Sequence, residues 1–351
     1  MKNKYLMIAI ALLAMFQTAG AQTESQTVEA QTDNQSAVAQ AANQTAEVQT
    51  EKKKKLQFKP IAITMMSLYS EFPADSKARY GFNLDRTYLG VQATWGENWL
   101  FKFVTDCGKS SSVDDYHRII YIKNALAQWK NSKFSVRVGM IGTNVFSTQE
   151  KIWGRRYVMK CFQDEYKFGS SADLGVAIEW SPVEQLSLDA IVVNGEGFKK
   201  VQMERGFLYG VGFTVKPFKN FLLRMYGDLN QSPDDGTPQK TLNAMVAYKD
   251  SKYSLAVEGN FVFDRDGTKA HNQSGLSTYG SVQVGRCDIF ARYDLLTSKD
   301  NWNSSNDRSM VLAGVGIDLC KYVKIAPNVK VWIPKEGKAT PCVNLNLQFS
   351  L

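Results

Sequence analysis

The chain of 351 residues carries a net charge of +8 and is 44% hydrophobic and 12% aromatic. After the first two dozen residues no apolar run approaches the ~18 residues that a membrane-spanning helix requires, which excludes a helical membrane protein. The odd number of cysteines, five, excludes a framework in which every cysteine pairs within the chain.

Residues 1–21 have the three parts of a signal peptide. Lys2 and Lys4 form a basic start, residues 5–16 are an apolar run too short to span a bilayer, and residues 19–21 form a cleavage site of small residues. No cysteine follows that site, so a lipid-anchored start is not expected. The sequence therefore predicts an exported protein whose mature form begins near Gln22, and any membrane crossing must be made by strands.

Residues 22–57 are predicted to be a disordered periplasmic spacer. Between residues 22 and 50 almost every side chain is small or polar, so the segment cannot bury enough surface to offset its ordering entropy. The spacer ends in a lysine run at residues 52–55, for which a solvated linker and a contact with anionic headgroups are both open interpretations. Residues 1–55 carry a net charge of +1, so the remaining chain carries +7.

From residue 58 to Leu351 the chain is a series of short alternating hydrophobic segments, closed in turn by a tight polar turn and by a long polar loop. Tight turns recur about every 35 residues, except for one wider gap that contains the third long connection, as an up-and-down antiparallel barrel requires. They are predicted at 96–98, 130–132, 181–183, 217–219, 249–251, 286–288 and 320–321. Longer connections are predicted near 70–79, 107–115, 142–167, 194–206, 230–239, 264–275, 296–308 and 334–340.

Within each segment, apolar and polar side chains alternate. Segment 221–230 sets Phe221, Leu223 and Met225 against Arg224 and Tyr226, and segments 99–106, 134–141 and 343–351 follow the same rule. Lipid-facing and lumen-facing residues alternate in this way in a membrane barrel. A soluble sandwich shows the same alternation with its apolar face inward, so the period alone leaves both interpretations open.

Three further features favour the membrane. Aromatic residues collect near strand ends, where interface girdles lie. Long and short connections alternate without a break. The chain also ends on an alternating strand with Phe349 and Leu351, which resembles the C-terminal insertion signal of outer-membrane barrels. We therefore predict an all-β fold, a transmembrane antiparallel up-and-down barrel of about 16 strands over residues 58–351, large enough to enclose an aqueous channel. A secreted or periplasmic β-protein is the alternative.

The chain resembles the bacterial porins, and within them the phosphate-selective group of Bacteroidetes-like bacteria. The residues that carry the likeness are the strand at 82–89, with Arg86 and Leu89, and Arg137-Val138-Gly139-Met140 followed by a long segment containing Glu150 and Trp153-Gly154-Arg155-Arg156. The resemblance implies an outer-membrane location in a Gram-negative bacterium, contact with outer-membrane lipid, and a homotrimer. It also implies that the third loop folds into the lumen, and the connection at 142–167 corresponds to that loop by position and length.

The predicted third loop concentrates charge. A pore constriction is expected at Glu150, Lys151, Arg155, Arg156 and Lys160. Folded inward, these groups would set a strong transverse field on passing solutes. A long solvated surface loop is the alternative, although Trp153, Tyr157 and Phe162 favour packing against a wall.

Strand phase also predicts which charged residues line the pore. The expected lining residues are Arg86, Lys102, Arg137, Arg224, Asp228, Arg292 and Lys330. Over all strands, the lumen-facing set holds seven bases and nine acids, without the arginine and lysine clusters of a dedicated phosphate ladder. The sequence therefore favours a general porin for small hydrophilic solutes and ions, and an anion-selective or phosphate-selective porin is the alternative.

Other functions have weaker support. Only His117 and His271 could act as a general base, neither lies in a nucleophile motif, and no cofactor, metal or nucleic-acid motif is recognisable. Residues 264–267 resemble part of a calcium loop but lack its later ligands. Cys287 and Cys320 lie in turns on the same rim, where a disulfide is conceivable. A narrow-lumen barrel that serves as an adhesin or structural protein remains the second alternative, and a transporter of hydrophobic compounds is disfavoured because the spacer is too polar to form a plug.

Overall fold

The computed structural model describes residues 55–109, 118–201, 206–231 and 236–351. The predicted signal peptide, nearly all of the predicted spacer and His117 lie outside these residues. The compact unit that contains the strands begins at Lys55, close to the predicted boundary at residue 58.

The described residues form sixteen strands. The first eight are β1 (Leu56–Glu71), β2 (Arg79–Trp95), β3 (Trp99–Lys109), β4 (Arg118–Lys130), β5 (Phe134–Gly142), β6 (Ala172–Val183), β7 (Leu186–Val193) and β8 (Leu208–Val215). The second eight are β9 (Phe221–Asn230), β10 (Gln239–Lys249), β11 (Tyr253–Phe263), β12 (Gln273–Val284), β13 (Cys287–Ser298), β14 (Arg308–Cys320), β15 (Val323–Pro334) and β16 (Thr340–Ser350).

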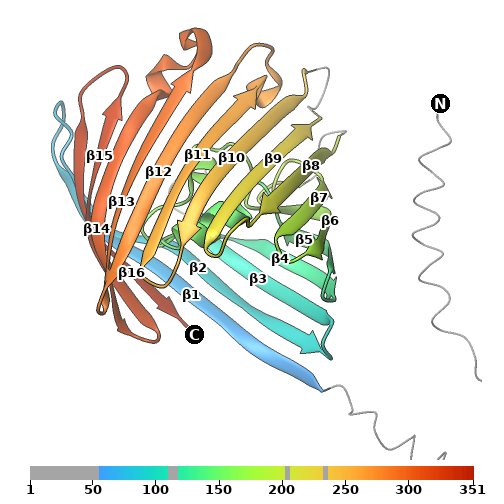
Figure 1. Cartoon of the computed structure of the whole chain (residues 1–351). Helices are drawn as coiled ribbons and strands as arrows, with labels where there is room; N and C mark the ends of the chain where they lie inside the picture. Colours follow the sequence, from blue (N-terminus) through green and yellow to red (C-terminus); the bar gives the residue numbers. More distant parts are fainter. Residues whose placement is uncertain (1–54, 110–117, 202–205, 232–235) are drawn as a thin grey trace, which may run out of the picture. The chain divides into compact units, whose positions relative to one another are not determined.

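Each strand pairs in antiparallel fashion with its neighbours in sequence, and β1 pairs with β16 to close the barrel (Figure 1). Closure leaves no sheet edge with unpaired backbone groups, which a lipid environment would not tolerate. The predicted all-β, up-and-down barrel of about 16 strands is therefore confirmed.

The strands alternate between an apolar outer face and a polar inner face. On β9, Leu223 and Met225 are 37% and 43% exposed outside, whereas Arg224 and Tyr226 are 3% and 2% exposed inside. The same alternation runs through β16, where Val343 faces outward. An exposed apolar exterior around a polar interior is the arrangement of a membrane barrel and the reverse of a soluble sandwich.

The connections fall close to the predicted positions, with two turns misplaced. The turn predicted at 286–288 lies one to two residues too late, because β13 already begins at Cys287 and the chain reverses at residues 285–286. The turn predicted at 181–183 is wrong, because β6 continues to Val183 and the chain reverses at residues 184–185. The pairing of β6 with β7 is irregular between Trp180 and Val183. Pro182 lies in this interruption, where its missing amide proton costs no ladder hydrogen bond.

In the described parts of the long connections lie two short α-helices and three 3₁₀ turns. The helices, α3 (Ser147–Trp153) and α4 (Phe162–Glu165), both belong to the connection between β5 and β6. The 3₁₀ turns are η2 (Arg265–Gly267), η3 (Lys299–Asn301) and η4 (Ser304–Asn306). Among the described residues, no helix is both long and apolar enough to cross a bilayer.

Candidate channel constriction

The third long connection, residues 143–171, folds into the barrel; we call it the third loop. Figure 1 shows it in green within the ring of strands. Its apolar side chains explain why it leaves the surface: Phe146, Trp153, Phe162 and Phe168 are each at most 2% exposed. Burying four large aromatic side chains favours docking against a wall over a solvated loop.

Local structure shapes the loop for this docking. Helix α3 ends at Gly154, which takes the left-handed conformation (φ +66°) that glycine adopts without strain and donates its amide proton to the carbonyl of Glu150. The chain can therefore reverse directly after Trp153. The indole of Trp153 packs edge-on against Tyr279 and Phe290, and its Nε1 donates to the carbonyl of Met159 at 2.7 Å.

Hydrogen bonds fix the loop to the wall formed by β10–β13. They join Gln149 to Asn243, Gln163 to Glu258 (3.0 Å) and Asn260, the Tyr166 hydroxyl to Asp294 (3.2 Å), and the Arg292 guanidinium to the carbonyl of Lys160 (2.6 Å). Because these wall groups are buried, removing a loop partner would leave unsatisfied polar atoms.

The same loop also contacts the opposite wall. The Nε of Arg156 donates to the Tyr88 hydroxyl of β2 at 3.3 Å, and Asn346 of β16 donates to the carbonyl of Tyr157 at 3.0 Å. In the strand order of the closed barrel, β2 lies directly across from β10, eight strands away in either direction, whereas β16 lies three strands from β13. The third loop therefore bridges the lumen from wall to wall.

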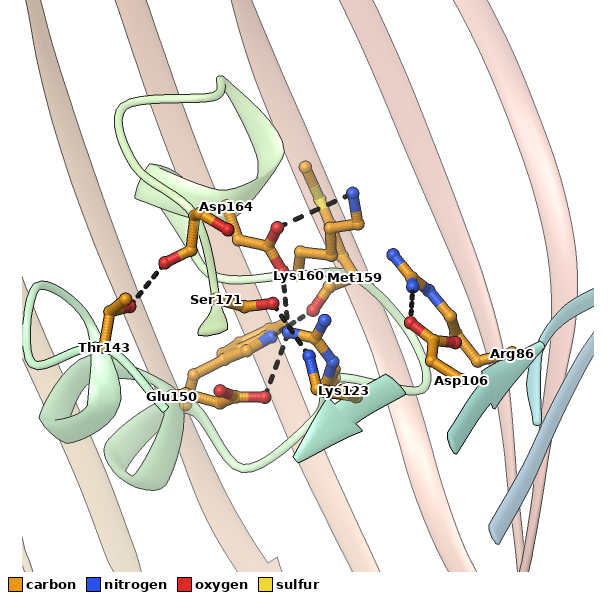
Figure 2. A network of polar contacts seen from close by, with 12 residues as sticks. Arg86, Asp106, Lys123, Thr143, Glu150, Met159, Lys160, Asp164 and Ser171 are labelled. Carbon is orange, nitrogen blue, oxygen red and sulfur yellow. Dashed lines mark hydrogen bonds and ion pairs between the residues drawn. The ribbon is translucent and has the colours of Figure 1, made fainter. Parts of the chain in front are cut away.

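A charge cluster lies on this bridge. Arg156 forms ion pairs with Glu150 at 3.0 Å and Asp164 at 2.7 Å, and Lys160 lies 3.8 Å from Asp164. Figure 2 shows Glu150, Lys160 and Asp164 gathered around this point, with Lys123 of β4 close by. Lys123 donates to the Ser171 hydroxyl at 2.7 Å and so ties the end of the loop to the barrel.

The cluster holds its charges at neutral pH. Burial alone would lower the pKa of Arg156, but Tyr88, Asp164 and Glu150 outweigh it and raise the pKa well above its ordinary value. Burial would likewise raise the pKa of Asp164, but Arg156 and Lys160 bring it below its ordinary value. The ion pair of Arg156 with Asp164 is therefore charged on both sides at neutral pH.

Two cavities adjoin the bridge. The larger, of about 620 Å³, lies between the third loop and the wall of β1, β2 and β16. The smaller, of about 230 Å³, lies toward the tight turns and is lined by Arg155 and Asp288, among others. Tyr157 contacts both. Burial raises the pKa of its hydroxyl to about 12, so it is a neutral group between the two spaces.

The larger cavity has an unequal charge balance. Three acids line it, Glu71, Asp85 and Glu165, against six cations, Arg79, Arg86, Arg156, Lys160, Lys199 and Lys330. The three lysines come from three different parts of the chain: the third loop, the connection after β7, and β15. Arg79, Arg86, Arg156 and Lys160 each have a carboxylate partner, so among the described residues Lys199 and Lys330 are the lining cations without an ion pair.

The five residues predicted to form the constriction separate in space. Glu150, Arg156 and Lys160 gather with Asp164. Arg155 lies instead toward the tight turns, where it pairs with Asp288. The Lys151 side chain is exposed and forms no ion pair with the described residues of the cluster, whereas its carbonyl accepts a hydrogen bond from Lys249 at 3.0 Å.

The predicted lining residues divide into three groups. Arg86, paired with Asp106, and Lys330 line the larger cavity. Lys102 and Asp228 occupy inner-face positions of β3 and β9 but line neither of the two cavities.

The remaining three arginines hold the third loop. Arg137 donates to Asn144 at 2.6 Å, and Arg224 donates to the carbonyl of Asn144 at 2.9 Å while pairing with Asp189 at 2.6 Å. Arg292 pairs with Asp294 at 2.7 Å, and its contact with Lys160 is given above. Arg224 and Arg292 are almost wholly buried. Their position on the inner face agrees with the strand phase, but the loop covers them.

Several residues of this region were not among the predicted site residues. Tyr88, Lys123, Asn346 and Lys199 come from β2, β4, β16 and the connection after β7. Strand phase places Tyr88, Lys123 and Asn346 on the inner face. Tyr88 and Asn346 were not predicted because only charged residues were considered. Lys123 was not predicted because it lies at a bulge in the β3–β4 pairing, where the alternation of side chains shifts. Nothing in the sequence pattern marks Lys199.

The other candidate chemistry finds no site in the described residues. His271 stacks on Trp302, with ring centroids 4.1 Å apart. All five cysteines are free thiols, so the disulfide considered between Cys287 and Cys320 is absent. No group of three or more histidine, cysteine or acidic side chains in the described ranges could hold a metal ion.

Comparison with known proteins supports the fold. No protein-family profile and no curated protein sequence match the chain. Among solved structures, OprB of Pseudomonas putida matches with a TM-score of 0.63 at 12% identity, over 89% of this chain and 97% of that one. An anion-selective porin from Comamonas acidovorans matches with a TM-score of 0.63 at 11% identity, over 85% of this chain and 100% of that one. OmpF of Salmonella typhi matches with a TM-score of 0.63 at 10% identity, over 85% of this chain and 98% of that one.

These likenesses define the class of fold. The chain is a porin-like barrel of sixteen antiparallel strands with an inward-folded third loop. At 10–12% identity the comparisons concern the fold alone.

Proposed function

We propose that this chain is an outer-membrane porin of a Gram-negative bacterium, through which small hydrophilic solutes and ions diffuse passively. The observation that carries the proposal is the polar cavity of about 620 Å³ beside a charged loop inside a closed barrel. Sixteen strands enclose a lumen wider than side chains alone can fill, and an inward loop reduces that lumen to the size of small solutes. The apolar exterior supports the membrane location.

Two measurements test this function. Purified protein in planar bilayers should give stepwise conductance, and liposomes containing it should swell in isotonic sugar solutions. A protein that inserts and migrates heat-modifiably on gels but neither conducts nor admits sugars would instead be a narrow-lumen adhesin or structural barrel. A channel is expected to conduct ions and to hydrolyse neither lipid nor peptide substrates.

A second candidate, an anion-selective porin, is favoured by the six cations and three acids that line the larger cavity. A reversal potential measured across a salt gradient distinguishes the two. Anion selectivity predicts a permeability ratio that favours chloride and falls in the variant Lys160→Gln/Lys199→Gln/Lys330→Gln. The matched control Lys77→Gln/Lys200→Gln/Lys269→Gln removes three exposed lysines that do not line the cavity.

The outcome that rejects the second candidate is equally direct. A cation-to-anion permeability ratio near or above one, without block by millimolar phosphate, leaves the general porin as the function.

The number of subunits is a separate question that the permeability ratio does not test. We propose a homotrimer by likeness, since a structurally similar outer-membrane protein, OmpT of Vibrio cholerae, is described in a trimer form.

A further inference from the structure

The tight-turn end of the barrel carries exposed cations that have no acidic partner. Lysines three positions apart bracket three of the turns, at residues 130–133, 216–219 and 249–252. We define the turn-end basic rim as these lysines, except Lys249, whose Nζ donates to carbonyl groups of the third loop, together with the cations of the last two turns: Lys130, Lys133, Lys216, Lys219, Lys252, Arg286 and Lys321. Within the described part of the chain, no ion pair joins any of them to a carboxylate.

The turns hold these lysines in fixed positions. Asn131 accepts the backbone amides of Lys133 and Phe134 at 2.8 and 2.7 Å. Asp250 accepts those of Lys252 and Tyr253 at 2.7 and 2.6 Å in the same way. Because the carboxylate of Asp250 is committed to these amides and to the Tyr248 hydroxyl, it closes the turn rather than pairing with a rim lysine.

Aromatic side chains fix the depth of the rim in a bilayer. Each rim lysine except Lys130, whose neighbour Trp129 is half-buried, lies one or two positions from an exposed aromatic residue; these aromatic residues are Phe134, Phe218, Tyr253 and Tyr322. The Nζ atoms of Lys252 and Lys321 lie 5.3 and 5.2 Å from the ring centroids of Tyr253 and Tyr322. Since such aromatics occupy the membrane interface, the neighbouring ammonium groups reach the level of the headgroup phosphates.

The opposite end of the barrel differs. There several cations pair with acids: Arg79 with Glu71 (3.0 Å), Lys240 with Asp264 (3.4 Å), Lys338 with Asp75 (2.7 Å) and Lys335 with Asp307 (3.6 Å). Exposed lysines without an ion pair among the described residues also occur at the loop end, for example Lys77 and Lys269. What distinguishes the rim is that its lysines recur at successive turns and lie beside exposed aromatic side chains, an arrangement that fits a negative surface around the barrel at that depth.

We propose that the turn-end basic rim binds the headgroups of anionic phospholipids in the leaflet around the tight turns. In porin-like barrels the short turns face the periplasm, so this is the periplasmic leaflet. Basic residues next to an anionic bilayer surface are attracted to it, and the attraction is screened by salt over a Debye length. The inference concerns the outer rim of the barrel and is independent of what the lumen transports.

Tryptophan fluorescence tests the proposal directly, because four tryptophans, Trp95, Trp99, Trp129 and Trp180, lie at the turn end of their strands. The full chain is reconstituted into phosphatidylcholine bilayers that contain either dibrominated phosphatidylglycerol or dibrominated phosphatidylcholine as quencher. A single lysine contact predicts an association of the anionic lipid about fivefold stronger than that of the zwitterionic lipid. The preference should approach one in about 1 M NaCl.

A matched pair of variants locates the effect. Lys130→Gln/Lys133→Gln/Lys216→Gln/Lys219→Gln should lose at least half of the preference. Lys77→Gln/Lys200→Gln/Lys269→Gln/Lys299→Gln removes the same charge from exposed lysines at the loop end and should keep it. Heat-modifiable migration establishes that each protein is folded, and if the quadruple rim variant does not fold, its two lysine pairs are measured separately.

Several outcomes would overturn the proposal. These are equal quenching by the two lipids, a rim variant that keeps its full preference, or a loop-end variant that loses as much. Loss of the preference in millimolar inorganic phosphate at constant ionic strength would assign the rim to free phosphate instead. Binding of isolated peptidoglycan that depends on the rim lysines, without any lipid preference, would assign it to that polymer.

Discussion

At the scale of a single residue, Gly275 allows the third loop to dock against the barrel wall. It lies on the inner face of β12, where a Cβ atom would lie 1.9 Å from the ring of Phe162. That ring is fully buried and packs against Tyr166 and Phe168. The absence of a side chain at residue 275 therefore creates the space that α4 occupies.

Gly275→Ala should loosen the loop. Overpacking of this kind costs about 1–3 kcal/mol, and the cost falls on the docking of α4 because the β12 backbone is held by both neighbours. Single-channel recordings should show greater current noise and a shifted conductance. Gly259→Ala is the control, since its Cβ would make an ordinary contact of 3.5 Å with Phe261. Identical traces for both variants would contradict this account.

At this scale, the sequence does not predict which of the inward-facing charged residues form ion pairs. Strand phase predicts which side chains point inward, but it counts Asp106, Asp189 and Asp294 as free acids. In the structure they pair with Arg86, Arg224 and Arg292, respectively. The balance that a solute meets depends on such pairings, which join residues that no local pattern connects.

At the scale of the element, the third loop depends on ion pairs that acid should break. The pKa of Asp164 lies below 3.8, because Arg156 and Lys160 outweigh the opposing effect of burial. A carboxylate with a lowered pKa adds stability above its unfolded value of 3.8 and loses it as the pH falls through the folded value. Docking of the loop should therefore be constant between about pH 5 and 8 and weaken below about 3.8.

Conductance recorded over this pH range measures the effect. The wild-type chain should gain noise reversibly in acid. Asp164→Asn should already be noisier at neutral pH and show a smaller acid transition, because Arg156 then keeps only Glu150 as an acidic partner. An unchanged acid transition in Asp164→Asn would show that other carboxylates control the loop.

Part of the loop was predictable. Its length and its content of Trp153, Tyr157 and Phe162 predicted that it packs against a wall, and all three are buried. Its far end was placed four residues too early, since β6 begins only at Ala172. The contacts with the walls could not be predicted, because they join residues as distant as Arg155 and Asp288, 133 positions apart.

At the scale of the whole molecule, stability depends on closure between β1 and β16. Nine residue pairs, from Ile63 with Ser350 to Glu71 with Cys342, form this seam. Without it, two strands would present unpaired amides and carbonyls to lipid, and each such group costs several kcal/mol.

Deletion of residues 340–351 should abolish folding. Urea-unfolded protein, refolded into detergent micelles so that cellular targeting plays no part, should yield no heat-modifiable band. Deletion of residues 22–33, equal in length and outside the barrel, should refold as the full chain does. A heat-modifiable band from the β16 deletion would mean that a fifteen-strand sheet can close by another pairing.

The architecture as a whole followed from the sequence because a barrel repeats two local signals, the alternation of side chains and the spacing of turns. One of its two misplaced turns, near Pro182, lies where the pairing itself is irregular. The signal peptide and the spacer remain predictions. The selectivity of the lumen could not be predicted in the same way, since it depends on which distant side chains meet across the barrel.

The cysteine that begins α4 gives the molecule a native probe of its own movements. Cys161 is 1% exposed, and burial followed by the nearby acids raises its pKa well above the ordinary value, so its thiol is shielded and unreactive while the loop is docked. Alkylation by a maleimide would require that segment to detach from β10–β13. The rate of labelling at the Cys161 sulfur thus measures, without any engineered substitution, how often this segment detaches and the width of the channel changes.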